Sequence, residues 1–317
     1  MSRFNARVLS RLGQSGSIFG MSLIEQKEKF PIKVVSADMS VVAGLDRFKK
    51  QFPEDFHNVG IAEQNLLGVS AGLSSEGYST IAVAQACFIT MRSFEQIRQY
   101  LGYMKNNVIC VGINSGLSLT FFGNTHYAIE DISLMRNIQG LKILSPADAI
   151  SAVMLFENAL QSNEPTYLRL HGGLNCPIVY NNIEFNPEKP NILREGNDIV
   201  IFATGSMVNT ALKVAELITD ISIRVVDIHT ISPIDRETII NSKNAKLVVT
   251  LEEHSINGGM GSCVAEIFSE YKDMPILLRL GMKDFFERIG DYQYLLQECR
   301  LTPELIAEDI LNKFQSL

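Results

Sequence analysis

The 317-residue sequence lacks several features that would place a protein in a class at once. No apolar run reaches transmembrane length, and the first residues lack the apolar core of a signal peptide. There is no basic excess either: the net charge is −7, whereas a nucleic-acid surface needs clustered lysine and arginine. These absences predict a cytoplasmic protein that neither spans a membrane nor binds nucleic acid, and that acts on a metabolite or a protein partner.

Cysteine is sparse and scattered. The five cysteines form no CxxC pair and have no histidine at metal-ligand spacing. Their odd number and wide separation favour a reducing compartment, where buried thiols act as small hydrophobic side chains. The sequence also lacks a GxGxxG turn after a strand, which a Rossmann-type nucleotide-binding protein would need. We therefore expect no metal site in this chain.

Short β-branched runs alternate with longer amphipathic stretches, which is typical of parallel α/β layers. Residues 177–194 are polar, contain proline and show neither a helical nor a strand period in their apolar residues. They therefore predict an interdomain linker. We predict two three-layer α/β domains, residues 1–178 and the smaller 194–317, joined by a linker at 179–193. The predicted strands are residues 33–36, 80–84, 108–113, 141–144 and 166–170, then 199–203, 223–227, 247–251 and 276–280.

The densest chemically informative segment is residues 58–65, Asn-Val-Gly-Ile-Ala-Glu-Gln-Asn. A strand-like lead and a glycine corner are followed by Glu63, which begins a helix with an apolar inner face. Taken alone, this pattern favours a partly solvated glutamate that interacts with the positive end of the helix dipole. A catalytic carboxyl is the alternative, and the rest of the sequence decides between them.

Eight segments in a fixed order give the sequence a wider resemblance. It resembles the pyrimidine-binding and C-terminal domains of transketolases and deoxyxylulose-phosphate synthases, and most closely the C-terminal subunits of split transketolases. The resemblance implies transfer of a two-carbon ketol unit from a ketose to an aldehyde, with thiamine diphosphate as cofactor. The segments are residues 36–39, 58–68, 88–98, 123–126, 145–148, 203–206, 226–227, and 252–254 with 258–259.

The resemblance implies two catalytic residues. Glu63 corresponds to the glutamate that hydrogen-bonds N1′ of the cofactor's aminopyrimidine, so that the cofactor's own 4′-nitrogen becomes the base. His126, in a Gly-Asn-Thr-His turn, corresponds to a residue that contacts a substrate hydroxyl or carbonyl and shuttles a proton. His57 and His171 are placed to line the same cleft, and His254 is expected to be structural.

The other implied contacts are to the cofactor. Phe88 corresponds to an aromatic that stacks on the pyrimidine ring, with core packing as the alternative. Arg92 lies one helical turn later and is placed to reach the cofactor or substrate, or to pack at a chain interface. Asp38 corresponds to a residue near the thiazolium, and a helix N-cap is the alternative.

Three substrate-contact positions depart from ordinary transketolases. Asn114 stands where they have a second histidine, Phe122 where they have an aspartate, and Gly172 where they have the phosphate-binding arginine. A glycine supplies no charge-assisted contact, so we expect a modified sugar or an unusual acceptor unless another arginine substitutes. The candidates for that substitution are Arg11, Arg92 and Arg169.

The sequence also lacks the Gly-Asp-Gly motif, with its downstream asparagine, that marks the diphosphate and Mg²⁺ site of the family. Residues 289–292, Ile-Gly-Asp-Tyr, come nearest but lack the second glycine. We therefore predict a partner, an N-terminal transketolase subunit that carries the Mg²⁺ ligands. The expected assembly is a heterotetramer in which copies of this chain also contact each other, with the apolar helix start at 259–267 as the candidate contact.

Other interpretations remain open. A β subunit of a 2-oxo-acid dehydrogenase E1 shares the two-domain plan, as does a synthase that decarboxylates pyruvate and joins the product to an aldehyde. From another class, the chain fits a non-catalytic scaffold that has kept the fold. Retention of Glu63, Phe88 and His126 favours a working enzyme.

Overall fold

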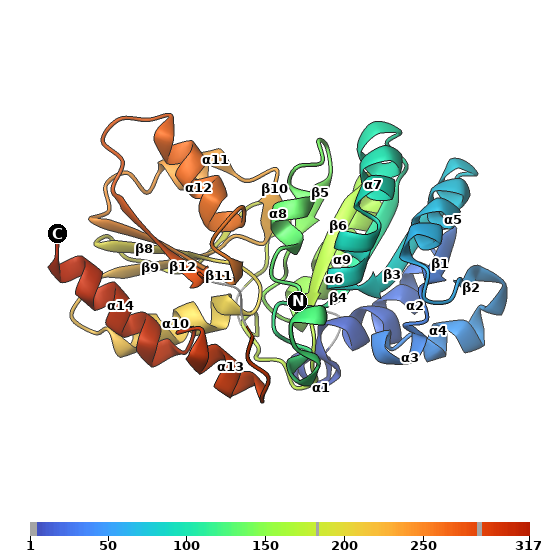
Figure 1. The fold of residues 1–317 in the computed structure, drawn as a ribbon, viewed down its shortest axis with the longest axis horizontal. Helices are drawn as coiled ribbons and strands as arrows, with labels where there is room; N and C mark the ends of the chain where they lie inside the picture. Colours follow the sequence, from blue (N-terminus) through green and yellow to red (C-terminus); the bar gives the residue numbers. More distant parts are fainter. Residues whose placement is uncertain (1–4, 182–183, 284–286) are drawn as a thin grey trace.

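The computed structural model describes residues 5–181, 184–283 and 287–317, which form two α/β units side by side (Figure 1). Residues 1–4 of the predicted first domain and residues 182–183 of the predicted linker lie outside the described residues. Within the described ranges, no helix is both long and apolar enough to cross a membrane.

The first unit is built on a seven-stranded sheet with the order β10-β5-β6-β4-β3-β1-β2. Neighbouring strands pair in parallel, except that β10 pairs antiparallel with β5. The five predicted strands are present. The two additional ones, β2 and β10, have three residues each, too few to show a period. The strands are β1 (Ile32–Ser36), β2 (Phe56–Asn58), β3 (Ser79–Gln85), β4 (Val108–Ser115), β5 (Lys142–Leu144), β6 (Thr166–His171) and β10 (Thr230–Ser232).

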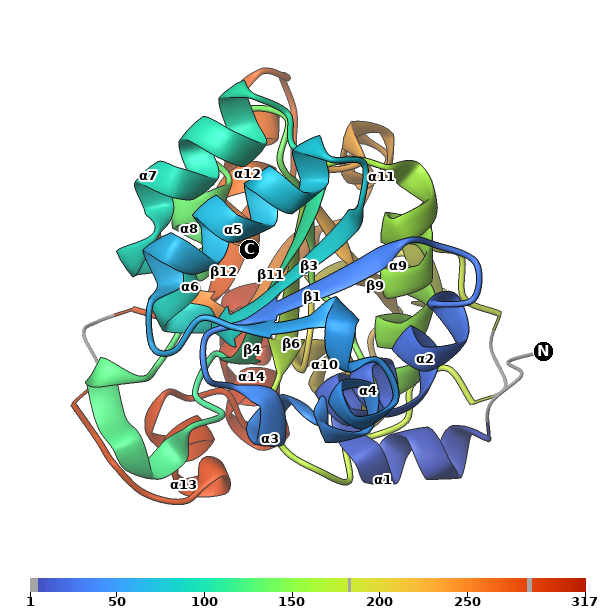
Figure 2. The same ribbon diagram turned by 90° about the vertical axis from the view of Figure 1, so that its right-hand side faces the viewer.

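Helices cover both faces of this sheet, so its strands are apolar on both sides (Figure 2). In β1, Val34 belongs to one buried cluster and its neighbour Val35 to the other. The first face carries α1 (Ala6–Ser17), a π-helical turn (Ile18–Ser22), α2 (Leu23–Gln26) and α9 (Ala149–Ser162). The opposite face carries α5 (Glu63–Ser75), α6 (Ala86–Arg92), α7 (Phe94–Gln96) with the π-helical segment Ile97–Tyr103, and α8 (Asp131–Met135). The short helices α3 (Ser40–Ala43) and α4 (Asp46–Gln51) follow β1.

The second unit has a five-stranded sheet with the order β12-β11-β8-β9-β7. Its neighbours pair in parallel except β7, which is antiparallel to β9. The four predicted strands are present, and β7 is additional. The strands are β7 (Asn191–Arg194), β8 (Ile199–Ala203), β9 (Ile223–Asp227), β11 (Leu247–Ser255) and β12 (Ile276–Met282). In Figure 1, α11 (Arg236–Ile240) and α12 (Met260–Ser269) lie above the sheet, and α10 (Met207–Leu217), α13 (Tyr292–Glu298) and α14 (Pro303–Gln315) lie below it.

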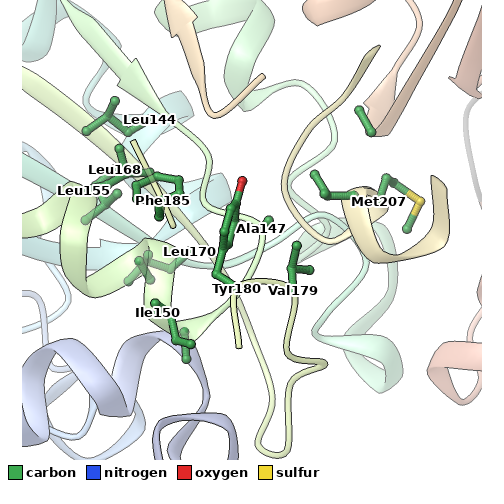
Figure 3. Packing of buried hydrophobic residues seen from close by; sticks show 14 of the residues in the cluster. Leu144, Ala147, Ile150, Leu155, Leu168, Leu170, Val179, Tyr180, Phe185 and Met207 are labelled. Atoms are coloured by element: carbon green, nitrogen blue, oxygen red, sulfur yellow. The ribbon is translucent and has the colours of Figure 1, made fainter. Parts of the chain in front are cut away.

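The connection between the units is more ordered than its composition predicts. Val179, Tyr180 and Phe185 are buried among apolar side chains of both units (Figure 3). The Tyr180 hydroxyl donates a hydrogen bond of 2.6 Å to Oδ2 of Asp227, whose burial raises the pKa of its carboxyl to about 8. The connection also ends early, since β7 begins at Asn191. The domain boundaries at 178 and 194 stay a prediction.

A buried arginine of the first unit is paired within that unit and also bonded to the second. Nε of Arg169 on β6 lies 2.8 Å from Oδ2 of Asp131, and both side chains are almost fully buried. Nη2 of the same arginine donates to the backbone carbonyl of Glu253 on β11, at 2.9 Å. Arg169 is therefore committed to the fold, and the suggestion that it substitutes as a phosphate-binding arginine is wrong.

The Glu253 carboxylate is a second link across the same boundary. Oε1 accepts the Leu117 backbone N–H at 2.7 Å, and Oε2 accepts the hydroxyls of Ser206 and Tyr292. His171 of the first unit places Nε2 3.5 Å from Oε2 and 3.0 Å from the Tyr292 hydroxyl. Burial by itself raises the pKa of Glu253, but the charge of His171 and these hydrogen bonds outweigh it and hold the pKa at about 2.

The contact between copies predicted at residues 259–267 rested on an apolar helix start that would be exposed, and the structure does not show such a surface. The apolar residues of α12 face the interior of their own unit, because Met260, Cys263, Val264 and Ile267 are all buried there. His254 is fully buried beside Asp131, which agrees with a structural position.

Candidate active site

The sequence-predicted site residues all follow strand ends at one edge of the first sheet. In doubly wound α/β sheets, ligands bind at the carboxyl ends of parallel strands. Asp38 follows β1, Glu63 follows β2, Phe88 and Arg92 lie on the helix after β3, and His126 lies in the loop after β4. The topology therefore brings segments far apart in the sequence to one place.

Glu63, Arg92 and Phe88 form one set of contacts. Glu63 is the first residue of α5 and is 5% exposed. Nη1 of Arg92, the last residue of α6, donates to its Oε1 at 2.9 Å. The same guanidinium lies over the Phe88 ring, with Cζ 3.6 Å from the ring centroid. A buried carboxylate and an aromatic face thus lie within reach of a single side chain.

His126 extends this set. Its ring is 5.0 Å from the Phe88 ring, centroid to centroid, at an edge-to-face angle of 65°. On its other side, the Phe122 ring centroid is 4.7 Å away. Burial of the imidazole and the positive charge of Arg92 lower the pKa of His126 below its ordinary value. The neutral imidazole is therefore favoured near pH 7.

Asp38 is held by a different set of contacts. Its backbone has the left-handed φ of 59°, and its N–H donates to Oδ1 of Asn58 at 3.1 Å. Nδ2 of Asn58 donates in return to the Asp38 carboxylate, also at 3.1 Å. α3 has Met39 at its N-cap, so Asp38 is not a helix cap. No contact among the described residues joins Asp38 to Glu63 or Phe88.

Comparisons with known proteins place the chain. It matches the transketolase pyrimidine-binding domain over residues 21–176 and the transketolase C-terminal domain over residues 188–306. A 6-deoxy-6-sulfo-D-fructose transketolase subunit of a Clostridium species is 35% identical over 279 residues, which are 87% of this chain and 86% of the relative. The chain belongs to the transketolase family. Proteins of this family use thiamine diphosphate, and the chain is a thiamine-diphosphate-dependent, transketolase-like transferase subunit.

Two further relatives agree with this assignment. An apulose-4-phosphate transketolase subunit of Actinobacillus succinogenes is 37% identical over 256 residues, which are 79% of this chain and 81% of the relative. Among solved structures, a split-gene transketolase described as an inactive beta4 tetramer superposes with a TM-score of 0.84 at 36% identity, covering 96% of this chain and 98% of its own.

The transketolase chain also carries polar side chains at this edge that motif analysis missed or placed only by resemblance. Nε2 of Gln85, the last residue of β3, is buried without a hydrogen-bond partner, as are Nε2 of His57 and Nδ2 of Asn114. Buried polar groups are nearly always paired in a complete assembly, so unpaired ones indicate a missing ligand or subunit. Nothing in the sequence around Gln85 distinguishes it from a buried strand residue.

Exposed apolar side chains surround the site. Phe121 and Phe122 are 72% and 60% exposed, and Ile61 and Met91 are exposed beside Glu63 and Arg92. Within the described part of the chain, no three His, Cys, Asp or Glu side chains are placed to hold a metal ion.

Proposed function

We propose that this chain is the C-terminal subunit of a split transketolase, which transfers a two-carbon ketol unit from a ketose donor to an aldehyde acceptor. The observation that carries the proposal is the contact set of Glu63, Arg92, Phe88 and His126, in which a buried carboxyl, an aromatic face and a neutral imidazole lie side by side. The family shows the reaction class, and this cluster supports assigning its chemistry to this edge of the sheet.

The cluster has the donor and stacking groups that an aminopyrimidine needs. We assign the hydrogen bond to N1′ to Glu63 and the stacking contact to Phe88, and we keep Arg92 and Asp38 as further proposed cofactor contacts. In this chain the Arg92 guanidinium already stacks on Phe88 and hydrogen-bonds Glu63. An aminopyrimidine that uses the same carboxyl oxygen or the same face of Phe88 would displace Arg92 from that contact.

Each residue of the cluster then has a separate task. When bound, thiamine diphosphate supplies a nucleophilic carbon and accepts the electron pair of the bond that breaks beside the carbonyl. Glu63 holds a proton at N1′ and so controls the tautomer of the ring. His126, which is neutral near pH 7, accepts a hydrogen bond or a proton from a substrate hydroxyl. The Phe122 ring limits water at His126.

A second subunit completes this site under the proposal. The exposed apolar side chains around Glu63 and Arg92 support a protein surface that covers them. Two relatives are named as subunits, and the beta4 tetramer of another is described as inactive. We propose an N-terminal transketolase partner that binds the diphosphate and Mg²⁺, in a cytoplasmic heterotetramer whose core is a contact between copies of this chain.

For the donor and acceptor, only a class of sugar is proposed. Gly172 contributes no cation to the site and Arg169 is buried in an ion pair, while Phe121 and Phe122 make one wall apolar. Two of the relatives are named for a sulfonated ketose and for apulose 4-phosphate. We propose a modified sugar rather than xylulose 5-phosphate with ribose 5-phosphate.

The partner requirement is tested by mixing. This chain and the partner subunit are assayed apart and together with thiamine diphosphate and Mg²⁺, on a panel of ketoses with an aldehyde acceptor. We expect ketol transfer only in the mixture, saturating at equal amounts of the two chains. Activity of this chain alone would overturn the split-site proposal. Transfer of an acyl group to a lipoyl carrier, or release of CO₂ from pyruvate, would replace it with one of the two related reactions.

A further inference from the structure

Asn114 is a buried amide without a partner at the carboxyl end of β4. It is 9% exposed, and its Nδ2 is buried without a hydrogen-bond partner among the described residues. Its backbone has a left-handed φ of 55°, which asparagine tolerates better than most residues. Burying an unpaired donor is unfavourable, so a fold that keeps one at the carboxyl end of a parallel strand points to a ligand.

Gly172, just after β6, provides the space that this amide occupies. A Cβ at Gly172 would lie 2.3 Å from Oδ1 of Asn114 and 2.8 Å from Cβ of Ser118. Its backbone N–H donates to Oγ of Ser118 at 3.0 Å, which fixes the main chain there. β4 and β6 are adjacent strands. Any side chain at Gly172 therefore displaces the Asn114 carboxamide, and the two residues form one structural unit.

The basic side chains that precede Gly172 on β6 are already engaged. His171, which precedes Gly172, contacts Tyr292 and Glu253, and Arg169 is paired with Asp131. The strand end bearing Asn114 runs directly into the loop that carries Phe122 and His126. A carboxamide carries no charge and suits an uncharged oxygen, because it can donate from its nitrogen or accept at its oxygen.

We propose that Asn114 is a substrate-binding residue whose carboxamide hydrogen-bonds a hydroxyl or carbonyl oxygen of the sugar, and that Gly172 must lack a side chain for this contact to form. The inference rests on the proposed transketolase function and names one specificity-determining pair of that site.

The test uses the reconstituted complex and three variants. Asn114→Gly removes the carboxamide without backbone strain, because glycine adopts positive φ freely. Gly172→Ala pushes the carboxamide aside. Each change is expected to raise KM for one sugar substrate about five- to tenfold, the loss of one hydrogen bond, with kcat and cofactor Kd nearly unchanged. In the double variant the effects do not multiply, since both remove the same contact.

Asn163→Gly is the matched control. Asn163 also has a left-handed φ, 53°, but it caps α9 away from the strand ends. It is expected to leave KM unchanged. An unchanged KM in Asn114→Gly, multiplied effects in the double variant, or weaker binding of the partner chain with normal KM would each overturn the proposal.

A separate measurement keeps this inference distinct from the proposed function. If the wild-type complex transfers no ketol unit, that function fails, and calorimetry is then used on the ketose panel. For the ketose that the wild-type complex binds most tightly, the neutral and the phosphorylated sugar are each titrated into the wild-type and Asn114→Gly complexes. The proposal predicts weaker binding of both sugars by a similar factor in the variant. Equal affinities, no binding to the wild type, or a loss confined to the phosphorylated sugar would contradict it.

Discussion

At the scale of single residues, Arg92 connects the candidate catalytic groups. It hydrogen-bonds Glu63, stacks on Phe88 and lowers the pKa of His126 through its charge. The sequence predicted that these residues lie near one another, because its pattern shows where strands end and which residues share a helix face. The double contact of Arg92 was not, since it depends on how α5 and α6 pack and on a side-chain rotamer that the sequence does not fix.

The His126 titration tests this arrangement in the chain without its partner. Removing the positive charge with Arg92→Met should raise the pKa of His126 toward its ordinary value of about 6.5, because a nearby cation disfavours the imidazolium. Burial remains, so the pKa should stay below that value. NMR titration of the labelled imidazole measures the change. Arg98→Met, one to two turns further along the chain at an exposed position, is the control. Identical titration in Arg92→Met and the wild type would contradict the geometry.

Asn114 and Gly172 show another limit of sequence reasoning at this scale. The resemblance identified both as departures from ordinary transketolases, but as two separate losses. The structure shows that a Cβ at Gly172 would collide with the Asn114 carboxamide. Contacts between residues 58 positions apart in the chain follow from the pairing of β4 with β6, which no local pattern reports.

At the scale of elements, the long buried strands were predictable, whereas of the short ones only β5 was. β3, β4 and β11 are buried along nearly their whole length and each contain an apolar run, because both faces of each sheet are covered. β2, β7 and β10 have three or four residues, and β7 lies in a segment that reads as polar linker. β10 belongs to the second half of the sequence but adds an antiparallel edge to the first sheet. Composition does not show that a strand of one unit will pair with the sheet of the other.

From the contacts of Glu253 we predict how the free energy of unfolding depends on pH. Its pKa is about 2 in the folded chain and about 4.5 ordinarily, so folding favours the carboxylate. This contribution is complete above about pH 4.5 and is lost as the pH falls toward 2. Glu253→Gln should lower the free energy of unfolding by on the order of 2–3 kcal/mol at pH 7, and the difference should shrink below pH 4.5.

Urea denaturation of the wild type and of Glu253→Gln at several pH values measures this effect. Glu216→Gln on the exposed face of α10 is the control, for which we expect little change at any pH. A difference between Glu253→Gln and the wild type that stays constant from pH 7 to pH 3 would refute the role assigned to the carboxylate.

At the scale of the whole molecule, the two units behave as one body in their contacts. β10 completes the first sheet, Arg169 binds the backbone of β11, and Tyr180 is hydrogen-bonded to Asp227. Composition divides the chain cleanly at the polar segment 179–193, yet apolar side chains of that segment are buried between the units. Composition therefore predicted the two sheets correctly. It did not predict the strand, hydrogen bonds and buried side chains through which the two units contact each other.

The fragment 1–178 tests this dependence. It retains the candidate cluster but loses β10, Glu253 and Tyr180, which leaves Arg169 and the edge of β5 without their partners. We expect the full chain to unfold in a single thermal transition and the fragment to be less stable by far, with faster proteolysis. Circular dichroism melts and limited trypsin digestion measure both properties. A fragment that unfolds at the same temperature as the full chain would show that the units are independent.

The central claim is that Glu63 activates the cofactor at a site that two different subunits complete. The most direct measurement is the ketol-transfer rate of the reconstituted complex with wild-type chain, with Glu63→Gln, and with Glu76→Gln at the exposed far end of α5 as control. We expect a rate lower by about 10²–10⁴ in Glu63→Gln alone, with unchanged affinity between the subunits. A Glu63→Gln complex as fast as the wild type would contradict it.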